Sequence, residues 1–131
     1  MSETKIELIR QLQQVTDALR GGVSAAEFSQ LLYSPDLVVV GEGWPRAIRS
    51  AEAFLPELVA LLDAWGPNAD VSFTIVDPFF DGADVATTLV DVYVAPREPT
   101  GTAERYRAIY AWKRLAQGWR VAVEMYAVGS F

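Results

Sequence analysis

The groups that could do chemistry in this chain are acids, tyrosines and hydroxyls, because the sequence contains no histidine and no cysteine. Histidine is the commonest general base near neutral pH, and its absence excludes Ser-His-Asp and Cys-His mechanisms. The absence of cysteine excludes disulfides, thiol nucleophiles and thiolate metal sites. Any reaction must therefore use Asp, Glu, Tyr, Lys, Arg, Ser or Thr side chains.

Asp91 stands out among the acids because it interrupts an apolar stretch, "TLVDVYV", that is typical of the centre of a strand. If Asp91 faced a cavity, burial would raise its pKa and make it a candidate general acid or base. We expect instead that it faces outwards beside Arg105 or Arg107, with the inward orientation as the alternative. Asp17 is a second candidate for proton transfer, and Tyr110 is the candidate hydrogen-bond donor.

The last two predicted strands indicate which side chains share a face. A four-residue loop, 115–118, pairs Arg114 with Trp119, and directly paired residues lie on the same face of a sheet. Counting from this loop puts the apolar side of the final strand in the interior, together with the aromatic residues of the strand before it. The predicted inner face consists of Tyr106, Ala108, Tyr110, Trp112, Val121, Val123 and Met125.

The other face of this hairpin is small, apolar and mixed in character, which suits contact with another protein better than bare water. We therefore expect a homodimer that forms through this outer face. By the same count, Glu124 is an interface or salt-bridge residue. The predicted outer face consists of Ile109, Ala111, Ala122, Glu124 and Tyr126.

Hydrophobic periodicity predicts the elements that position these residues. Leu8, Leu12 and Leu19 recur at helical spacing, and Ser24 with Glu27 fits a capping box at the start of a second helix. The second half of the chain alternates in the manner of strands. Helices that precede a run of strands indicate an α+β fold. The predicted order is helix, helix, strand, helix and four strands, over residues 4–20, 24–32, 36–41, 50–65, 70–78, 83–95, 103–114 and 119–128.

Composition limits the classes of partner. The length of 131 residues predicts a single domain, 1–131, and a net charge of −6 argues against nucleic acid as a ligand. No apolar run approaches the roughly 18 residues of a membrane span, and the first residues lack a secretory signal, so we expect a cytoplasmic protein without membrane contact. Asp77, Asp81 and Asp84 lack the spacing of a calcium loop, and we expect no metal and no cofactor.

Three phrases in this order of elements resemble the nuclear transport factor 2-like superfamily: "LLYSPDLVVVGEGW", "GADVATTLVDVYV" and "YAWKRLAQGWRVAVEMY". That superfamily includes SnoaL-like polyketide cyclases, ketosteroid isomerase and the association domain of calmodulin-dependent kinase. The resemblance implies a cone-shaped, curved antiparallel sheet wrapped around three N-terminal helices and open at one end to a pocket. It also implies a homodimer through the convex face of the sheet and a position for Trp44 near the cavity mouth.

The resemblance does not carry over the catalytic set of ketosteroid isomerase. The isomerase's Asp base falls at Gly41 of this chain, and its helix-one Tyr has no counterpart, with Asp17 near the same height. Its second oxyanion acid falls near Tyr110. The inner-face histidines of many kinase-association-like relatives fall at Val123 and Met125.

We therefore predict a protein that binds a small apolar or aromatic molecule, without an identifiable catalytic set. One alternative is an isomerase, cyclase or dehydratase that uses Asp91 or Asp17 as proton-transfer group and Tyr110 as donor. Another is an assembly module whose cone is filled by its own side chains, in which Tyr110 and Trp112 are core residues. The predicted pocket residues are Tyr33, Trp44, Tyr106, Tyr110, Trp112, Val123 and Met125.

Overall fold

The computed structural model describes residues 2–131 and follows the predicted order of elements, with one two-residue strand in addition. None of the helices in these residues combines the length and apolar character needed to cross a membrane. The helices are α1 (Glu3–Arg20), α2 (Ala25–Leu32) and α3 (Ala51–Trp65), and the strands are β1 (Tyr33–Gly41), β2 (Ile48–Arg49), β3 (Val71–Asp81), β4 (Val85–Val94), β5 (Glu104–Leu115) and β6 (Gly118–Val128).

The capping box predicted for α2 is present and sets the start of that helix. The Ser24 hydroxyl accepts a hydrogen bond of 3.2 Å from the Glu27 backbone N–H, and the Glu27 carboxylate accepts from the Ser24 backbone N–H at 3.5 Å. The helix ends at Leu32, and Tyr33 follows at once as the first residue of β1. This tight junction places the Tyr33 side chain in the interior, where it is 7% exposed.

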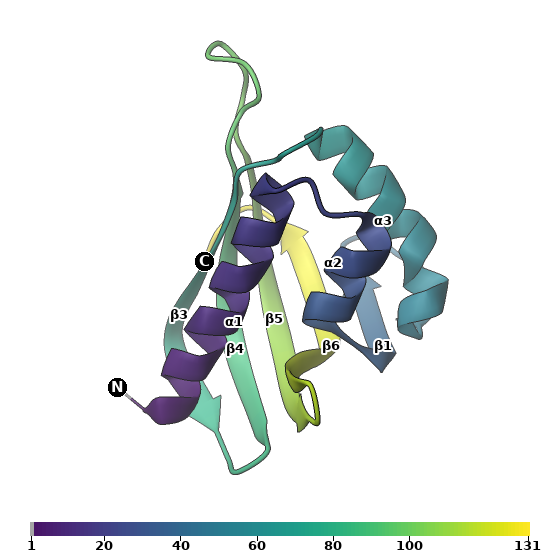
Figure 1. Ribbon diagram of the computed structural model, residues 1–131. Coiled ribbons are helices and arrows are strands. Elements are labelled where there is room, and N and C mark those ends of the chain that lie inside the picture. Colours follow the sequence, from purple (N-terminus) through teal and green to yellow (C-terminus); the bar gives the residue numbers. More distant parts are fainter. Residues whose placement is uncertain (1) are drawn as a thin grey trace.

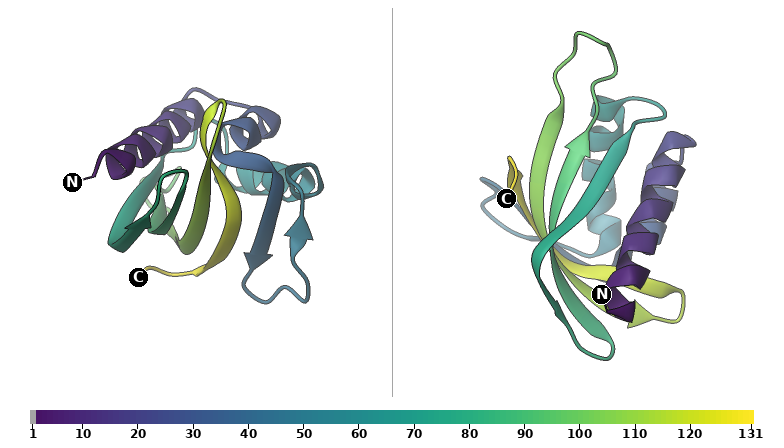
Figure 2. Two further views of the ribbon diagram at one scale, coloured as in Figure 1. Left: turned by 90° about the horizontal axis from the view of Figure 1, so that it is seen from below. Right: turned by 90° about the vertical axis from the view of Figure 1, so that its left-hand side faces the viewer.

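All six strands form one sheet, in the order β2-β1-β6-β5-β4-β3. The strands from β3 to β6 form an antiparallel meander, and β1 lies parallel to β6. The sheet curls around the helices, as Figures 1 and 2 show. α1 packs on β3, α3 packs on β1, and α2 contacts both of the other helices. The predicted α+β fold, with a curved sheet wrapped around N-terminal helices, is confirmed.

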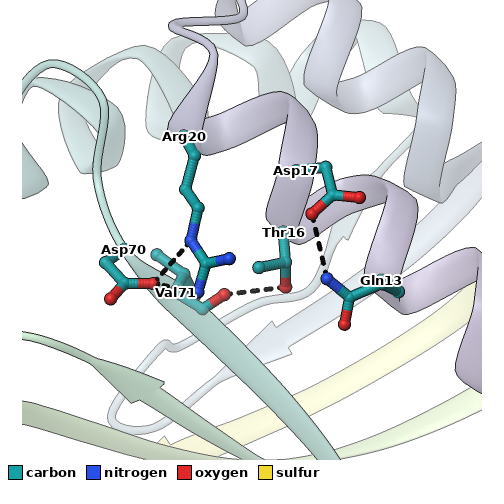
Figure 3. Close-up of polar contacts among 6 residues, drawn as sticks. All are labelled: Gln13, Thr16, Asp17, Arg20, Asp70 and Val71. Atoms are coloured by element: carbon teal, nitrogen blue, oxygen red, sulfur yellow. Dashed lines mark hydrogen bonds and ion pairs between the residues drawn. The ribbon is translucent and has the colours of Figure 1, made fainter.

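Polar contacts fasten α1 to the start of β3, as Figure 3 shows. The Thr16 hydroxyl donates a buried hydrogen bond of 2.7 Å to the Val71 carbonyl oxygen. At the end of the helix, the Arg20 guanidinium donates two hydrogen bonds, of 2.9 and 2.7 Å, to one carboxylate oxygen of Asp70. These bonds fix the helix against the sheet edge that closes one half of the cone.

The hairpin of β5 and β6 follows the predicted pairing only near its loop. Trp112 lies opposite Val121 as predicted, but the next β5 residue, Ala111, pairs with Val123. Ala122 is therefore an extra residue in β6, which makes a β-bulge. A one-residue insertion reverses the facing of every later side chain, because side chains alternate along a strand.

The bulge corrects four facing predictions. Val123 and Met125, predicted to line the pocket, lie on the outer face, where they are 39% and 50% exposed. Glu124 and Tyr126, predicted to form the outer dimer face, point inwards instead. Glu124 is buried and Tyr126 is half-buried against the core.

Candidate functional site

A cavity of about 340 Å³ lies between α2, α3 and the inner face of the curved sheet. Its volume falls at the small end of the range for small-molecule sites. The wall is mostly apolar, and within residues 2–131 no lysine or arginine lines it. Its aromatic lining includes Tyr33, Phe54, Trp65, Tyr106, Tyr110 and Tyr126.

Glu124 presents a buried carboxyl group to this cavity. Its side chain lines the wall, and only 6% of the residue is exposed. The Tyr33 hydroxyl donates a hydrogen bond of 2.8 Å to Glu124 Oε1. Burial raises the pKa of Glu124 from 4.5 to about 7, and the Tyr33 hydrogen bond opposes this rise. The carboxyl can therefore gain or lose a proton near neutral pH, as a general acid or base does.

The tyrosines around this carboxyl, unlike Glu124, do not titrate near neutral pH. Burial first, and the charge of Glu124 second, raise the pKa of Tyr33 and of Tyr110 well above 10. Burial, then the charge of Glu124 and then that of Glu57 raise the pKa of Tyr126. Tyr110 is also the β5 residue directly paired with Glu124, so the two side chains share the inner face. These phenols keep their protons at neutral pH and can donate hydrogen bonds beside an acid that titrates.

The structure brings three of the predicted pocket residues to the cavity. Tyr33, Tyr106 and Tyr110 line it, and their contact with a ligand stays a prediction. Trp112 lies outside this lining at 2% exposure. Its indole N–H donates a hydrogen bond of 2.9 Å to the Thr88 hydroxyl, so Trp112 fills the core behind the cavity.

Trp44 supports the cavity wall from behind. Its ring meets Tyr126 edge to face, with centroids 5.6 Å apart, and a tilted contact of 6.4 Å joins it to Phe54. The ring covers Gly41, where an added Cβ would lie 2.4 Å from the nearest ring atom. Gly41 therefore lets the indole pack flat on β1, from where it contacts two residues of the lining.

The two aspartates considered for proton transfer lie away from the cavity. Asp91 pairs with Arg107 on the outer side of the sheet, as expected, and accepts a hydrogen bond of 2.9 Å from the Phe131 backbone N–H. Asp17 is exposed on α1, where the Gln13 side-chain amide donates to it at 2.9 Å (Figure 3). Neither acid forms with Tyr110 the pair that an aspartate-based mechanism needs.

Two of the three acids near the β3–β4 turn, Asp77 and Asp84, form ion pairs with different basic residues. Asp77 lies 3.8 Å from the Lys5 ammonium, and Asp84 lies 3.7 Å from the Arg114 guanidinium. Across residues 2–131, no group of three or more acidic side chains is placed to hold a metal ion. The cavity lining contains two acids, and Glu57 is the exposed one, so the buried polar chemistry of the cavity is that of Glu124 and its neighbouring hydroxyls.

Sequence reasoning missed Glu124 because it counted the residue onto the wrong face. A signal for it was nevertheless present: Glu124 is a carboxylate in the middle of the apolar run "VAVEMYAV", the same kind of interruption that drew attention to Asp91. The interruption marks an unusual position in a strand, but it does not say which face the acid occupies.

Comparisons with known proteins concern the fold. The sequence matches no protein-family model and no curated protein. A ketosteroid isomerase-like protein from Erwinia carotovora atroseptica superposes with a TM-score of 0.69 over 100% of both chains, at 17% identity. A cystatin-like protein of unknown function from Nostoc punctiforme gives 0.74 over 98% of this chain and 93% of its own, at 14% identity. An NTF2-like protein from Novosphingobium aromaticivorans gives 0.65 over 96% and 82%, at 19% identity.

Proposed function

Because the chain has the nuclear transport factor 2-like fold that its sequence predicts, we propose that it binds a small, uncharged molecule in the Glu124 cavity and moves a proton on it. The observation that carries this proposal is the buried carboxyl of Glu124, whose pKa of about 7 suits proton transfer at neutral pH. The aromatic wall without basic residues, within the described range 2–131, favours an uncharged and largely apolar ligand.

The reaction class that fits is the movement of a proton between carbon atoms next to a carbonyl group. Ionised Glu124 takes a proton from one carbon, and the electron pair of that C–H bond moves towards the carbonyl oxygen. The resulting carboxylic acid returns the proton at another carbon, so no oxidant or reductant is needed. Tyr110 can donate to the developing oxyanion because it stays protonated, while Tyr33 holds the carboxyl in place. An isomerase-type activity also agrees with the ketosteroid isomerase-like description of the Erwinia protein.

Deuterium exchange into 2-tetralone, a bicyclic ketone, tests this proposal. We expect the wild-type protein to accelerate exchange of the protons next to the carbonyl, with a rate that rises as pH passes through about 7. Glu124→Gln should slow the protein-catalysed exchange roughly 100-fold or more. Asp91→Asn is the matched control and should exchange at the wild-type rate, because Asp91 lies on the outer face. Equal rates for wild type and Glu124→Gln would contradict the role of Glu124.

A second candidate function is binding without chemistry. It is favoured by the Tyr33 hydrogen bond, since a carboxyl held by one phenol can serve to orient a ligand as well as to move a proton. In that case 2-tetralone binds to the wild-type protein, as measured by calorimetry, without any acceleration of its exchange. Binding and exchange together exclude this second candidate.

The outer sheet face supports a further proposal, that a second copy of the chain covers it. Leu89, Ile109 and Met125 are direct neighbours across β4, β5 and β6, and the last two are 40% and 50% exposed. Met125 belongs to this face, whereas Glu124 and Tyr126 leave it. Sedimentation should show a dimer that Ile109→Lys converts to a monomer, because a buried unpaired charge disfavours association. A wild-type monomer at micromolar concentration would overturn the dimer proposal.

A further inference from the structure

Trp65, the last residue of α3, has an unused hydrogen-bond donor at the cavity wall. The residue lines the cavity and is 6% exposed. Among residues 2–131, its indole Nε1 has no hydrogen-bond partner. Trp112 and Trp119, by contrast, donate their indole N–H groups to side-chain oxygens at 2.9 and 2.7 Å. An indole N–H can only donate, so an acceptor is what this position lacks.

Tyr106 lies beside the Trp65 indole but does not satisfy it. The Tyr106 hydroxyl donates a hydrogen bond of 2.8 Å to Glu104 Oε2, at the exposed rim. Burial first and Glu104 second raise the pKa of Tyr106, and a weak hydrogen-bond contact with the Trp65 side chain lowers it. This contact lacks the distance or alignment of a full hydrogen bond, so within the described chain Nε1 has no partner of good geometry. Tyr106 is only partly buried and lines the same cavity, so access of a ligand to the buried indole N–H requires the Tyr106 side chain to turn aside.

The Trp65 donor and the Glu124 carboxyl belong to different ends of the cavity. Tyr106, beside Trp65, precedes Tyr110 by four residues in β5, which is about 13 Å of strand. Tyr110 is the direct partner of Glu124. A ligand that fills the cavity along β5 can thus have its reacting atoms at Glu124 and its far end at Trp65.

We infer that the ligand carries a second, uncharged hydrogen-bond acceptor, such as a carbonyl oxygen, at the end away from Glu124, and that Trp65 Nε1 binds it. This inference rests on the proposed function, since both concern one cavity. A hydrocarbon end would leave the donor unpaired, and a carboxylate end would meet no basic lining residue in the described chain, 2–131. Trp65 is thus a specificity-determining residue that takes no part in proton transfer.

Two probes that differ in one atom group test the inference. The first is 6-acetyl-2-tetralone, and the second is 6-isopropenyl-2-tetralone, in which a methylene group replaces the acetyl oxygen. For each protein we compare the dissociation constant of the isopropenyl probe with that of the acetyl probe. We expect this ratio to be about fivefold larger in the wild type than in Trp65→Phe. In nitrogen–proton correlation spectra of the wild type, the Trp65 indole proton should move downfield with the acetyl probe alone. This spectroscopic readout does not depend on the folding of any variant.

Tyr106→Phe is the control for the neighbouring hydroxyl and should keep the wild-type preference for the acetyl probe. Loss of the preference in Tyr106→Phe would assign the donor to Tyr106 and overturn the inference. Equal binding of both probes, with no shift of the Trp65 indole proton, would also overturn it. In that case continued exchange of 2-tetralone would leave the proposed function standing. If neither probe nor 2-tetralone binds, the proposed function fails and this inference fails with it.

Discussion

The half of the cone under α1 and the half under α3 differ in how their buried polar groups are satisfied. In the α1 half two buried donors are paired: the Thr16 hydroxyl with the Val71 carbonyl of β3 at 2.7 Å, and the Trp112 indole of β5 with the Thr88 hydroxyl of β4 at 2.9 Å. Leu8 and Leu12 fill the space between helix and sheet at 2% exposure or less. Among residues 2–131, no buried side-chain donor or acceptor of this half lacks a hydrogen-bond partner, as is typical of a structural core.

The half under α3 is incompletely filled and incompletely paired. It contains the cavity, the titrating carboxyl of Glu124 and, within residues 2–131, the unpaired indole of Trp65. Buried groups of this kind reduce stability, so they persist where another molecule can satisfy them. We therefore interpret the α1 half as the main source of folding stability and the α3 half as the binding site, whose cavity and unpaired groups reduce stability.

The sharpest test of this interpretation is a matched pair of leucine truncations. Leu12→Ala should lower the free energy of unfolding by about 4 kcal/mol, because the side chain is 2% exposed in a filled core. Leu61→Ala should cost only about 1 kcal/mol, since Leu61 is partly buried and already borders a cavity. Urea unfolding of both variants measures the difference. Equal losses of unfolding free energy in the two variants would show that the two halves are packed alike and would contradict the proposed difference between them.

The next largest effect is a pH dependence that comes from Glu124. Its pKa rises from 4.5 to about 7 on folding, so the folded chain keeps a proton that the unfolded chain releases. The stability from this proton is complete below pH 4.5 and is lost as pH rises through about 7, a decrease of about 3 kcal/mol.

Glu124→Gln should lack this decrease, because an amide does not titrate in that range. The measurement is the difference in unfolding free energy between wild type and variant at several pH values from 4 to about 8. A difference that stays constant over this range would mean that Glu124 has the same pKa in the folded and unfolded chains. Asp36 offers a contrast, since its hydrogen bond from Lys113 lowers its pKa in the folded chain.

The order of elements and the packing of the α1 half could be predicted from the sequence. Leu8, Leu12 and Leu19 keep helical spacing and are buried as a stripe, and the capping box at Ser24 forms as predicted. The loop 115–118 pairs its flanking residues as counted. These features are local, so periodicity and turn length determine them.

The lining of the cavity in the α3 half could not be predicted in the same way, because no local sequence signal marks the bulge at Ala122. From Val123 to Tyr126, apolar residues alternate with Glu124 and a tyrosine, so either face can be counted inwards. The expectation that charges stay outside favoured the wrong register. The actual register arises where β6 pairs with β5 on one side and, in parallel, with β1 on the other. That is a long-range feature, as is the missing partner of Trp65.

The smallest expected effect separates the roles of two tyrosines beside Glu124. Tyr33→Phe removes the hydrogen bond that lowers the pKa of Glu124, so this pKa should rise above its value of about 7. The variant should also lose about 1 kcal/mol of stability. Tyr110→Phe is the matched change. It leaves the Tyr33 hydrogen bond intact, so the pKa of Glu124 should stay near 7.

Carbon NMR titration of the glutamate carboxyl groups, together with the pH profile of 2-tetralone exchange, distinguishes the two variants. In Tyr33→Phe the midpoint of the profile should move to higher pH, because the base itself has changed. In Tyr110→Phe the midpoint should stay and the rate should fall at every pH, because a donor to the oxyanion is lost. An unchanged midpoint in Tyr33→Phe would show that the Tyr33 hydrogen bond does not lower the pKa of Glu124. Burial alone would then account for that pKa.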